Sequence, residues 1–192
     1  MATATEPTLT FYAQQIDSLL KKAIAAPESR LHWVTLASVN STKQYTEPDL
    51  RMVVLRAVDE ERNLLFYTDS RSPKTDQFKS NPKASVLLFD PTSMMQLRIF
   101  GEVRVDTRSE LHLNTLEQLR DDSRVNYSTL DAPGTPSASW VIRHDAQKTH
   151  FALLTFQSQK FDLLHLRREG ALRIQATNGS NQQLEQLRWV TP

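Results

Sequence analysis

The middle of the chain is a succession of short apolar runs separated by turn signals, a pattern typical of strands and short helices. Between two of these runs, Ser72 and Pro73 have the residue types of a helix start, which predicts a short helix over Lys74 to Ser80. The runs at 51–56, 64–69 and 96–103 are rich in β-branched and aromatic residues. The block from Arg51 to Val105 therefore predicts strand, turn, strand, basic helix start, strand and strand.

Arginines stand at both ends of the first run. Side chains of a strand alternate between its two faces, so Arg51 and Arg56 leave opposite faces. Arg51 shares one face with Val53 and Leu55, and Arg56 shares the other with Met52 and Val54. A guanidinium at a strand start is a good ligand for phosphate or carboxylate, although a solvated strand end is the simpler interpretation of either arginine alone.

The helix start makes an anion site the stronger interpretation. Unpaired backbone N–H groups and the positive end of the helix dipole attract anions, and Lys74 adds a full charge where an acidic residue is usual. Thr68 ends the preceding strand and brings a hydroxyl to the same neighbourhood. Arg51, Thr68, Ser72 and Lys74 together predict a phosphate site.

These residues form an ordered pattern: Arg-Met-Val-Val-Leu-Arg, Phe-Tyr-Thr-Asp, Ser-x-Lys, Asn-Pro and Gln-x-Arg-x-x-Gly. The pattern resembles the pyridoxamine 5'-phosphate oxidase family of FMN-binding split barrels. The resemblance implies that Arg51, Thr68, Ser72 and Lys74 hold the FMN phosphate. It also implies that the first strand lies along the flavin and that Gln96 reaches the ring. The FMN-binding residues it implies are Arg51, Met52, Val53, Val54, Leu55, Arg56, Tyr67, Thr68, Ser72, Lys74, Gln96 and, by a match to a later arginine, Arg173.

Two departures from the family pattern are visible. The family carries an Arg-x-His pair near the C-terminus that orients the substrate, and the corresponding stretch from Arg167 to Arg173 has no histidine. The lysine that closes the first motif is Arg56 here, which keeps the charge and changes its geometry. The departures weaken the expectation of vitamin B6 oxidation and leave the expectation of FMN binding intact.

Outside this block the pattern predicts an amphipathic helix from Thr8 to Ile24, a loop from Ser41 to Asp49 and a helix from Thr107 to Arg124. A breaker-rich loop follows over 125–139. In the family that the chain resembles, this region and the preceding helix supply groups for the substrate phosphate, so the resemblance implies Arg120, Arg124, Tyr127 and Ser128 as candidates. Further strands are predicted at 31–40, 150–156, 161–166, 172–177 and 184–190, with a hairpin turn at Asn178 and Gly179. This order predicts a mainly β protein, an antiparallel barrel with peripheral helices. The family resemblance implies that this barrel is a Greek-key split β-barrel.

Length and composition narrow the class of protein. The 192 residues are expected to form one domain over 1–192. The 23 basic and 22 acidic residues are well mixed, so no nucleic-acid partner is expected. Absence of cysteine excludes thiol chemistry, and the lack of long apolar runs or a signal-like start predicts no membrane span and a cytoplasmic location.

Catalytic groups and metal ligands are not apparent in the sequence. The five histidines are scattered, and each is interpreted as a surface or packing residue. The adjacent Asp121 and Asp122 point apart on a helix, which argues against a paired-carboxylate site. We therefore expect no metal, and no catalytic residue is nominated.

The leading hypothesis is an FMN-dependent oxidoreductase acting on a small substrate. The resemblance also implies a homodimer with FMN at the interface. A second hypothesis is a non-catalytic flavin-binding module that serves as a redox reporter or carrier. A third is a split barrel that binds haem or a different flavin.

Overall fold

The computed structural model describes residues 8–25, 29–145, 147–179 and 181–192. Within them, eight strands form a single sheet, and helices lie around it. In chain order the elements are α1 (Leu9–Ile24), η1 (Arg30–His32), β1 (Trp33–Ser41), β2 (Thr46–Val58), β3 (Leu64–Asp69), α2 (Pro73–Ser80), β4 (Lys83–Asp90), β5 (Met95–Asp106), α3 (Glu110–Glu117), α4 (Asp121–Arg124), η2 (Val125–Tyr127), β6 (Phe151–His165), β7 (Leu172–Asn178) and β8 (Leu184–Val190).

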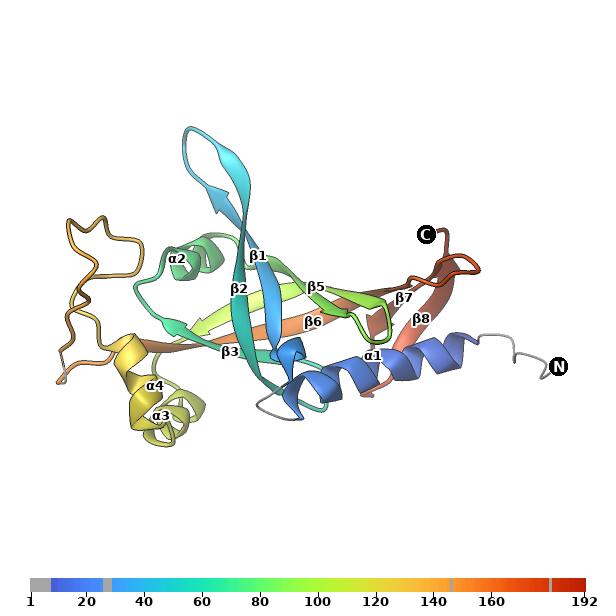
Figure 1. The fold of residues 1–192 in the computed structure, drawn as a ribbon, viewed down its shortest axis with the longest axis horizontal. Helices are drawn as coiled ribbons and strands as arrows, with labels where there is room; N and C mark the ends of the chain where they lie inside the picture. The colour runs from blue at the N-terminus through green and yellow to red at the C-terminus, as the bar shows by residue number, and fades with distance from the viewer. Residues whose placement is uncertain (1–7, 26–28, 146, 180) are drawn as a thin grey trace.

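The strands close into a barrel. Their order is β3-β2-β1-β4-β5-β6-β7-β8, and all pairings are antiparallel. β3 also pairs with β6, which closes six strands and leaves β7 and β8 as an extension (Figure 1). Three consecutive strands with a fourth returning beside the first is Greek-key order. The predicted Greek-key split barrel with peripheral helices is confirmed.

Alternation of side chains builds the core. Along β5 the odd-numbered residues from Met95 to Val103 are buried, and the same alternation runs along β4. The apolar stripe of α1, including Ile16 and Leu20, joins the same core cluster as these strands. Thr8 caps this helix by accepting a hydrogen bond from the backbone N–H of Phe11 at 3.1 Å. The amphipathic helix predicted from Thr8 to Ile24 is therefore present, and its apolar face covers part of the barrel.

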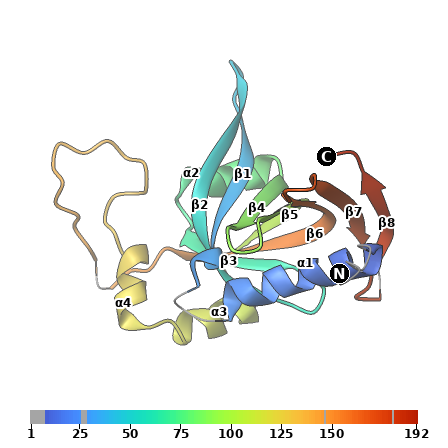
Figure 2. The same cartoon turned by 45° about the vertical axis from the view of Figure 1, so that its right-hand side comes forward.

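Two pairings are short, and this opens the barrel. β1 pairs with β4 only from Thr35 to Ala37. β2 pairs with β3 only over residues 55–58, with a register shift between Leu55 and Ala57. Residues 38–54 therefore pair only within their own hairpin, which projects from the barrel (Figures 1 and 2). We call this hairpin the arm.

Several predicted boundaries were wrong because sheet pairing overrode local pattern. The predicted loop over 41–49 is mostly strand, since β2 begins at Thr46 and pairs with β1 across the whole hairpin. The two strands predicted at 150–156 and 161–166 are one strand, β6, held continuous by β5. The helix predicted from 107 to 124 is broken between α3 and α4. The β7–β8 turn includes Gly179 but is longer than the predicted two-residue turn.

Gly101 explains why one motif ends in glycine. A Cβ atom there would collide with the backbone carbonyl of Gln157 on β6. The register of β5 against β6 shifts between Phe100 and Gly101, so the two backbones approach closely at this point.

Among the described residues, no helix is long and apolar enough to cross a membrane.

Candidate functional site

Four of the predicted phosphate ligands lie together at the base of the arm. β2 supplies Arg51, β3 ends with Thr68, and the start of α2 supplies Ser72 and Lys74. The Nζ atom of Lys74 donates to Thr68 Oγ1 at 3.1 Å and to Ser72 Oγ at 2.6 Å. Arg51 reaches the same helix through Gln77, whose Oε1 accepts from Nη2 at 3.1 Å. We call Arg51, Thr68, Ser72 and Lys74 the cradle.

The start of α2 is unusual in how its polar groups are used. Ser72 is the N-cap residue and Pro73 the first helical residue, as predicted, but the Ser72 hydroxyl makes no capping bond to the helix. It is bound by Lys74 instead, while both Thr68 and Ser72 are buried. Burial lowers the pKa of Lys74, and the nearby Arg51 guanidinium lowers it further. Lys74 is thus a partly desolvated cation beside a second cation, and an anion placed there would stabilise both.

Arg51 is oriented by its own chain. Its Nη1 donates to Ser38 Oγ at 2.6 Å, and its Nη2 lies 2.6 Å from Asp49 Oδ2. The Gln77 side chain ties this group together, because its Nε2 donates to the same Asp49 oxygen at 2.9 Å. Two carboxylates act on Lys74, and each is also paired with an arginine: Asp49 with Arg51 and Asp69 with Arg71. The donor set of the cradle, two cations and two hydroxyls, fits a phosphate group.

The outer face of β2 carries a different set of residues. Met52 and Arg56 are exposed, whereas Leu55 is buried and Val53 packs against the core, so the predicted alternation of the two arginines is confirmed. The Arg56 guanidinium lies 5.2 Å from the centre of the Tyr67 ring. Burial raises the pKa of the Tyr67 hydroxyl, and the positive charge of Arg56 opposes this shift.

The edge of β2 that faces β3 is open beside the cradle. From Arg51 to Val54, β2 pairs with β1 on one side, and the pairing with β3 begins only at Leu55. Backbone N–H and C=O groups on this edge are available to a ligand with donors and acceptors along its rim. Val53 and Leu55 turn their side chains into the barrel, so their expected contact with a flavin would come through the backbone.

Gln96 and Arg173 lie elsewhere in the chain. They share the outer face of β5 and β7, where Gln96 is opposite Leu164 and Leu164 is opposite Arg173. Arg173 is held by Asp162, with its Nε 3.0 Å from Oδ1 and its Nη2 2.8 Å from Oδ2. The strand order places β5 three strands from β2, about 14 Å at the usual spacing. The structure therefore does not bring Gln96 and Arg173 to the cradle of the same chain.

Asp162, on β6, accepts hydrogen bonds from both neighbouring strands, β5 and β7. Besides Arg173, it accepts from Arg98 Nη2 at 3.0 Å and from Gln175 Nε2 at 2.9 Å. Burial of the carboxyl opposes its ionisation, but the donors of Arg173, Gln175 and Arg98 outweigh this and hold the pKa of Asp162 at about 2. We call Arg98, Asp162, Arg173 and Gln175 the Asp162 cluster.

The candidates for a substrate phosphate between 120 and 128 are mostly engaged. Arg120 is exposed and pairs with Asp122. The Arg124 guanidinium donates to carbonyl groups at the end of α3, including Leu116 O at 2.7 Å. Ser128 donates to the carbonyl of Val125. Tyr127 lies near Arg56 of the outer face. Burial raises the pKa of the Tyr127 hydroxyl, and the positive charge of Arg56 opposes this rise.

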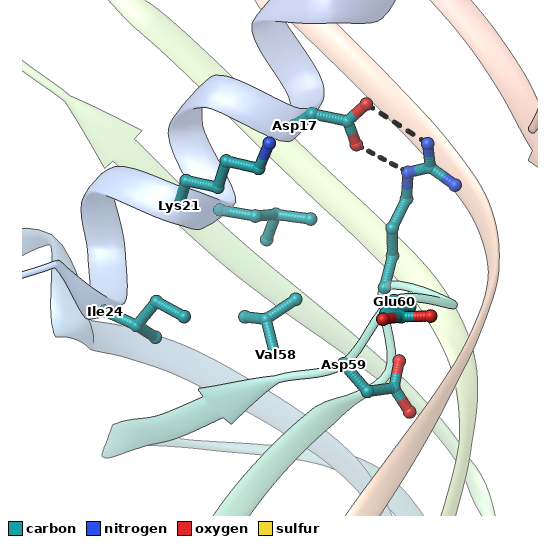
Figure 3. Close-up of a pocket in the computed structure, with 8 residues that line it drawn as sticks. Asp17, Lys21, Ile24, Val58, Asp59 and Glu60 are labelled. Carbon is teal, nitrogen blue, oxygen red and sulfur yellow. Dashed lines mark hydrogen bonds and ion pairs between the residues drawn. The ribbon is translucent and has the colours of Figure 1, made fainter. Parts of the chain in front are cut away.

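A separate pocket lies between α1 and the β2–β3 turn. Figure 3 shows Lys21, Ile24 and Val58 along it. The pocket has a volume of about 440 Å³. Asp17 forms a two-point ion pair with Arg62 there, at 2.6 and 3.1 Å. Asp59 and Glu60 add further negative charge to the rim, which does not suit a phosphate. In the described part of the chain, no group of three potential metal ligands occurs.

Several residues around the cradle and the Asp162 cluster were not predicted from the sequence. For two of them, Ser38 and Asp162, the sequence pattern does contain a signal. Ser38 follows the buried Val34 and Leu36 on the inner face of β1, so a polar residue there needs a buried partner. Asp162 is a single acid inside the apolar run 161–164. Asp49 and Gln77 carried no such signal, because their roles depend on the approach of the arm to α2.

Comparison with known proteins agrees with this architecture. The family model of the pyridoxamine 5'-phosphate oxidase FMN-binding domain matches residues 12–107. A pyridoxine/pyridoxamine 5'-phosphate oxidase from Burkholderia thailandensis is 31% identical over 96 residues, covering 50% of this chain and 43% of that protein. One from Aliarcobacter butzleri is 27% identical over 149 residues, covering 78% and 61%. The chain thus matches about half the length of these relatives.

Two solved structures share the fold over nearly the whole chain. A pyridoxamine 5'-phosphate oxidase-related, FMN binding protein from Nostoc punctiforme has a TM-score of 0.73 at 22% identity, covering 98% of this chain and 99% of that one. PhzG from Burkholderia lata, solved in complex with tetrahydrophenazine-1-carboxylic acid, has a TM-score of 0.72 at 14% identity, covering 98% of each. At these identities the likeness concerns the fold.

Proposed function

The chain belongs to the pyridoxamine 5'-phosphate oxidase family of FMN-binding domains, and we propose that it is an FMN-dependent oxidoreductase acting on a small anionic substrate. The observation that carries this proposal is the cradle. Lys74, Thr68 and Ser72 are already linked by hydrogen bonds at a helix start, and burial of Lys74 makes an anion favourable there. The cofactor that the family binds carries a phosphate of the required charge.

The chain's own residues have distinct tasks in this proposal. Arg51 and Lys74 bind the phosphate, and Ser38 and Gln77 hold Arg51 in place. The open edge of β2 offers backbone groups to the ring. When bound, the flavin supplies the hydride or electron acceptor, which the protein side chains lack.

Arg56 supports an anionic substrate. No carboxylate of a described residue lies within ion-pair distance of this guanidinium, whereas Arg51 on the same strand is paired with Asp49. It lies over Tyr67 and beside Tyr127, on the face of β2 opposite the buried core. A substrate carboxylate or phosphate would find an unneutralised cation there. Arg56→Met should raise the KM for such a substrate more than Arg104→Met, a change of an exposed arginine on β5.

A second copy of the chain belongs to the same proposal. The outer face of β1, β2 and β4 exposes large apolar residues, with Leu50 60% and Met52 58% exposed. Trp33, Leu87 and Phe89 are also exposed on it, and the register puts Phe89 opposite Gln96. Pairing of this face with that of another copy would bury it and bring the partner's Gln96 towards the cradle. A homodimer would therefore unite the two groups of predicted flavin ligands that one chain keeps apart.

A non-catalytic flavin carrier is the second candidate. The Asp162 cluster favours it, because Arg173 and Gln175 are both bonded to Asp162, and the stretch 167–173 lacks the histidine of the family's Arg-x-His pair. Turnover of B6 phosphates stays a prediction of the resemblance alone. The cytoplasmic location likewise stays a prediction of the sequence.

An absorption spectrum of the purified protein tests the proposal first, followed by anaerobic addition of pyridoxamine 5'-phosphate and pyridoxine 5'-phosphate. Bleaching of the flavin bands would support oxidase activity on these substrates. Flavin that stays oxidised with these and with other small anionic reductants would favour the carrier. Absence of flavin, even after reconstitution with FMN, would remove the central proposal.

A further inference from the structure

A buried acidic residue lies beside the cradle, at the end of β3. Asp69 directly follows Thr68, and its side chain is only 4% exposed. Its Oδ1 accepts a hydrogen bond from the backbone N–H of Arg71 at 2.8 Å, an Asx turn that directs the chain towards the start of α2. An ionised carboxylate in this place repels a phosphate, so the site can bind one well only if that charge is compensated.

The Arg71 side chain supplies the compensating charge. Its Nε lies 3.1 Å from Oδ1 of Asp69 and its Nη2 lies 2.7 Å from Oδ2, the two-point geometry in which arginine binds a carboxylate most strongly. The guanidinium also donates to the carbonyl oxygens of Thr129 and Leu130, at 2.9 and 3.1 Å. With 23% of the Arg71 side chain exposed, the pair is better shielded from water than an ordinary surface ion pair.

Lys74 is surrounded by charges of both signs. Burial lowers the pKa of Lys74 and Arg51 lowers it further, whereas Asp69 and Asp49 raise it. Arg51 lies 2.6 Å from Asp49, just as Arg71 lies 2.7 Å from Asp69. The two arginines therefore limit how far the two carboxylates can neutralise Lys74.

We propose that Arg71 sets the charge of the phosphate site by neutralising Asp69, so that the positive charge of Lys74 is left to a bound phosphate. The inference rests on the proposed FMN function and assigns to it a residue outside the cradle. Arg71 is a positioning residue, because it acts on the ligand through Asp69 and Lys74. The charge of the site is then determined by four residues of the β3–α2 turn and helix start as much as by the two cations of the cradle.

A purely structural role of Arg71 is the alternative, because its bonds to Thr129 and Leu130 also tie the segment after η2 to the β3–α2 turn. Those bonds would fix the segment whatever the charge of Asp69. Asp131, in the same segment, also acts on Arg71 and is itself paired with Arg143 at 3.5 Å. A charge role and a structural role differ in what happens when the Asp69 charge is removed together with that of Arg71.

The first test is a double-mutant cycle on the Kd for FMN, measured by flavin fluorescence with the full chain. Arg71→Met leaves the charge of Asp69 uncompensated, and we expect the Kd to rise about tenfold or more. Asp69→Asn removes that charge and nearly keeps the shape, so the double variant Asp69→Asn, Arg71→Met should bind FMN about as well as the wild type. Lys148→Met, the loss of an exposed cation paired with Asp145, is the control and should leave the Kd unchanged.

The second readout is the pKa of Lys74 in the protein without added FMN. The pH dependence of amine acylation at Lys74, followed by mass spectrometry, measures this pKa. In Arg71→Met the uncompensated Asp69 stabilises the protonated amine, so the pKa of Lys74 should be higher than in the wild type, and the double variant should restore it. Because FMN affinity falls only above the free-protein pKa, the fall should begin at a higher pH in Arg71→Met.

Two outcomes would overturn the inference. Equal loss of FMN affinity in Arg71→Met and in the double variant would show that Arg71 acts as a structural tie or touches the phosphate itself. Wild-type affinity and a wild-type pKa of Lys74 in Arg71→Met would show that Asp69 needs no compensation. A wild-type protein that binds no FMN contradicts the proposed function instead, and acylation of Lys74 then still tests the charge relation among Arg71, Asp69 and Lys74.

Discussion

The cradle and the Asp162 cluster are built from the same kinds of residue and differ in charge balance. In the cradle the carboxylates Asp49 and Asp69 are each paired with an arginine, and burial together with the charge of Arg51 lowers the pKa of Lys74. In the cluster two arginines close on one buried carboxylate, and the pKa of Asp162 falls to about 2, which marks an anion already satisfied. Arginine and lysine therefore indicate a ligand site only where the chain does not neutralise them.

This difference in charge balance predicts that the cradle acts mainly in cofactor binding and the Asp162 cluster mainly in stability. Asp162 adds side-chain bonds to the backbone pairing of β5, β6 and β7, at the junction where the barrel continues into its β7–β8 extension. The hydrogen bonds of the cradle are expected to contribute little to the stability of the fold. Substitutions in the two groups should therefore have different effects on stability and on FMN binding.

Removal of the buried carboxylate should give the largest effect. Asp162→Ala leaves Arg98 and Arg173 facing each other without a counter-charge, and we expect the free energy of unfolding to fall by about 3 kcal/mol. Urea denaturation without added FMN measures this. Glu102→Ala removes an exposed partner of Lys83 and should cost about 0.5 kcal/mol or less. Equal losses in the two variants would contradict the structural role of the cluster.

Removal of the cradle cation should weaken FMN binding with little loss of stability. Lys74→Met keeps the length of the side chain but removes a charge-assisted contact to phosphate, which should raise the Kd for FMN about 30- to 100-fold. Lys79→Met, on the exposed side of the same helix, serves as the control. Titration of flavin fluorescence gives both values. Unchanged affinity in Lys74→Met would show that the phosphate lies elsewhere.

The lowered pKa of Lys74 also predicts a pH dependence of FMN affinity. A phosphate dianion favours the protonated amine, so the pKa of Lys74 should be higher in the complex than in the free protein. Affinity should then be constant at lower pH and fall as pH rises from the free-protein pKa towards that of the complex. Lys74→Arg stays charged and should flatten the profile. Identical profiles for the two proteins would separate Lys74 from the phosphate.

The smallest effect should come from the predicted ring contact across the dimer. Gln96→Leu removes a hydrogen bond that only a partner copy could supply, and we expect FMN affinity to fall about fivefold. The loss should appear at protein concentrations where the dimer forms and vanish on dilution. A loss that persists in the monomer would place Gln96 at the cradle of its own chain, against the strand order.

The sequence predicted correctly those features that depend on a single helix or strand. Alternation along β2 determined that Arg51 and Arg56 leave opposite faces, and Ser72 with Pro73 determined where α2 begins. It failed for the 41–49 segment because pairing with β1 turns an apparently polar loop into strand. It also failed at the break between α3 and α4, where Arg124 folds back onto the carbonyls that end α3. The single-domain assignment stays a prediction.

The sequence by itself determined the residue types of the cradle and the elements that carry them, since residue types, strand period and helix-start signals are local properties. Only the tertiary structure decided which cations are left unneutralised. Asp49 meets Arg51 because the arm folds against α2, and Asp162 meets Arg98 and Arg173 because three strands place them in register. Charge balance depends on distances between remote segments, which no local pattern encodes.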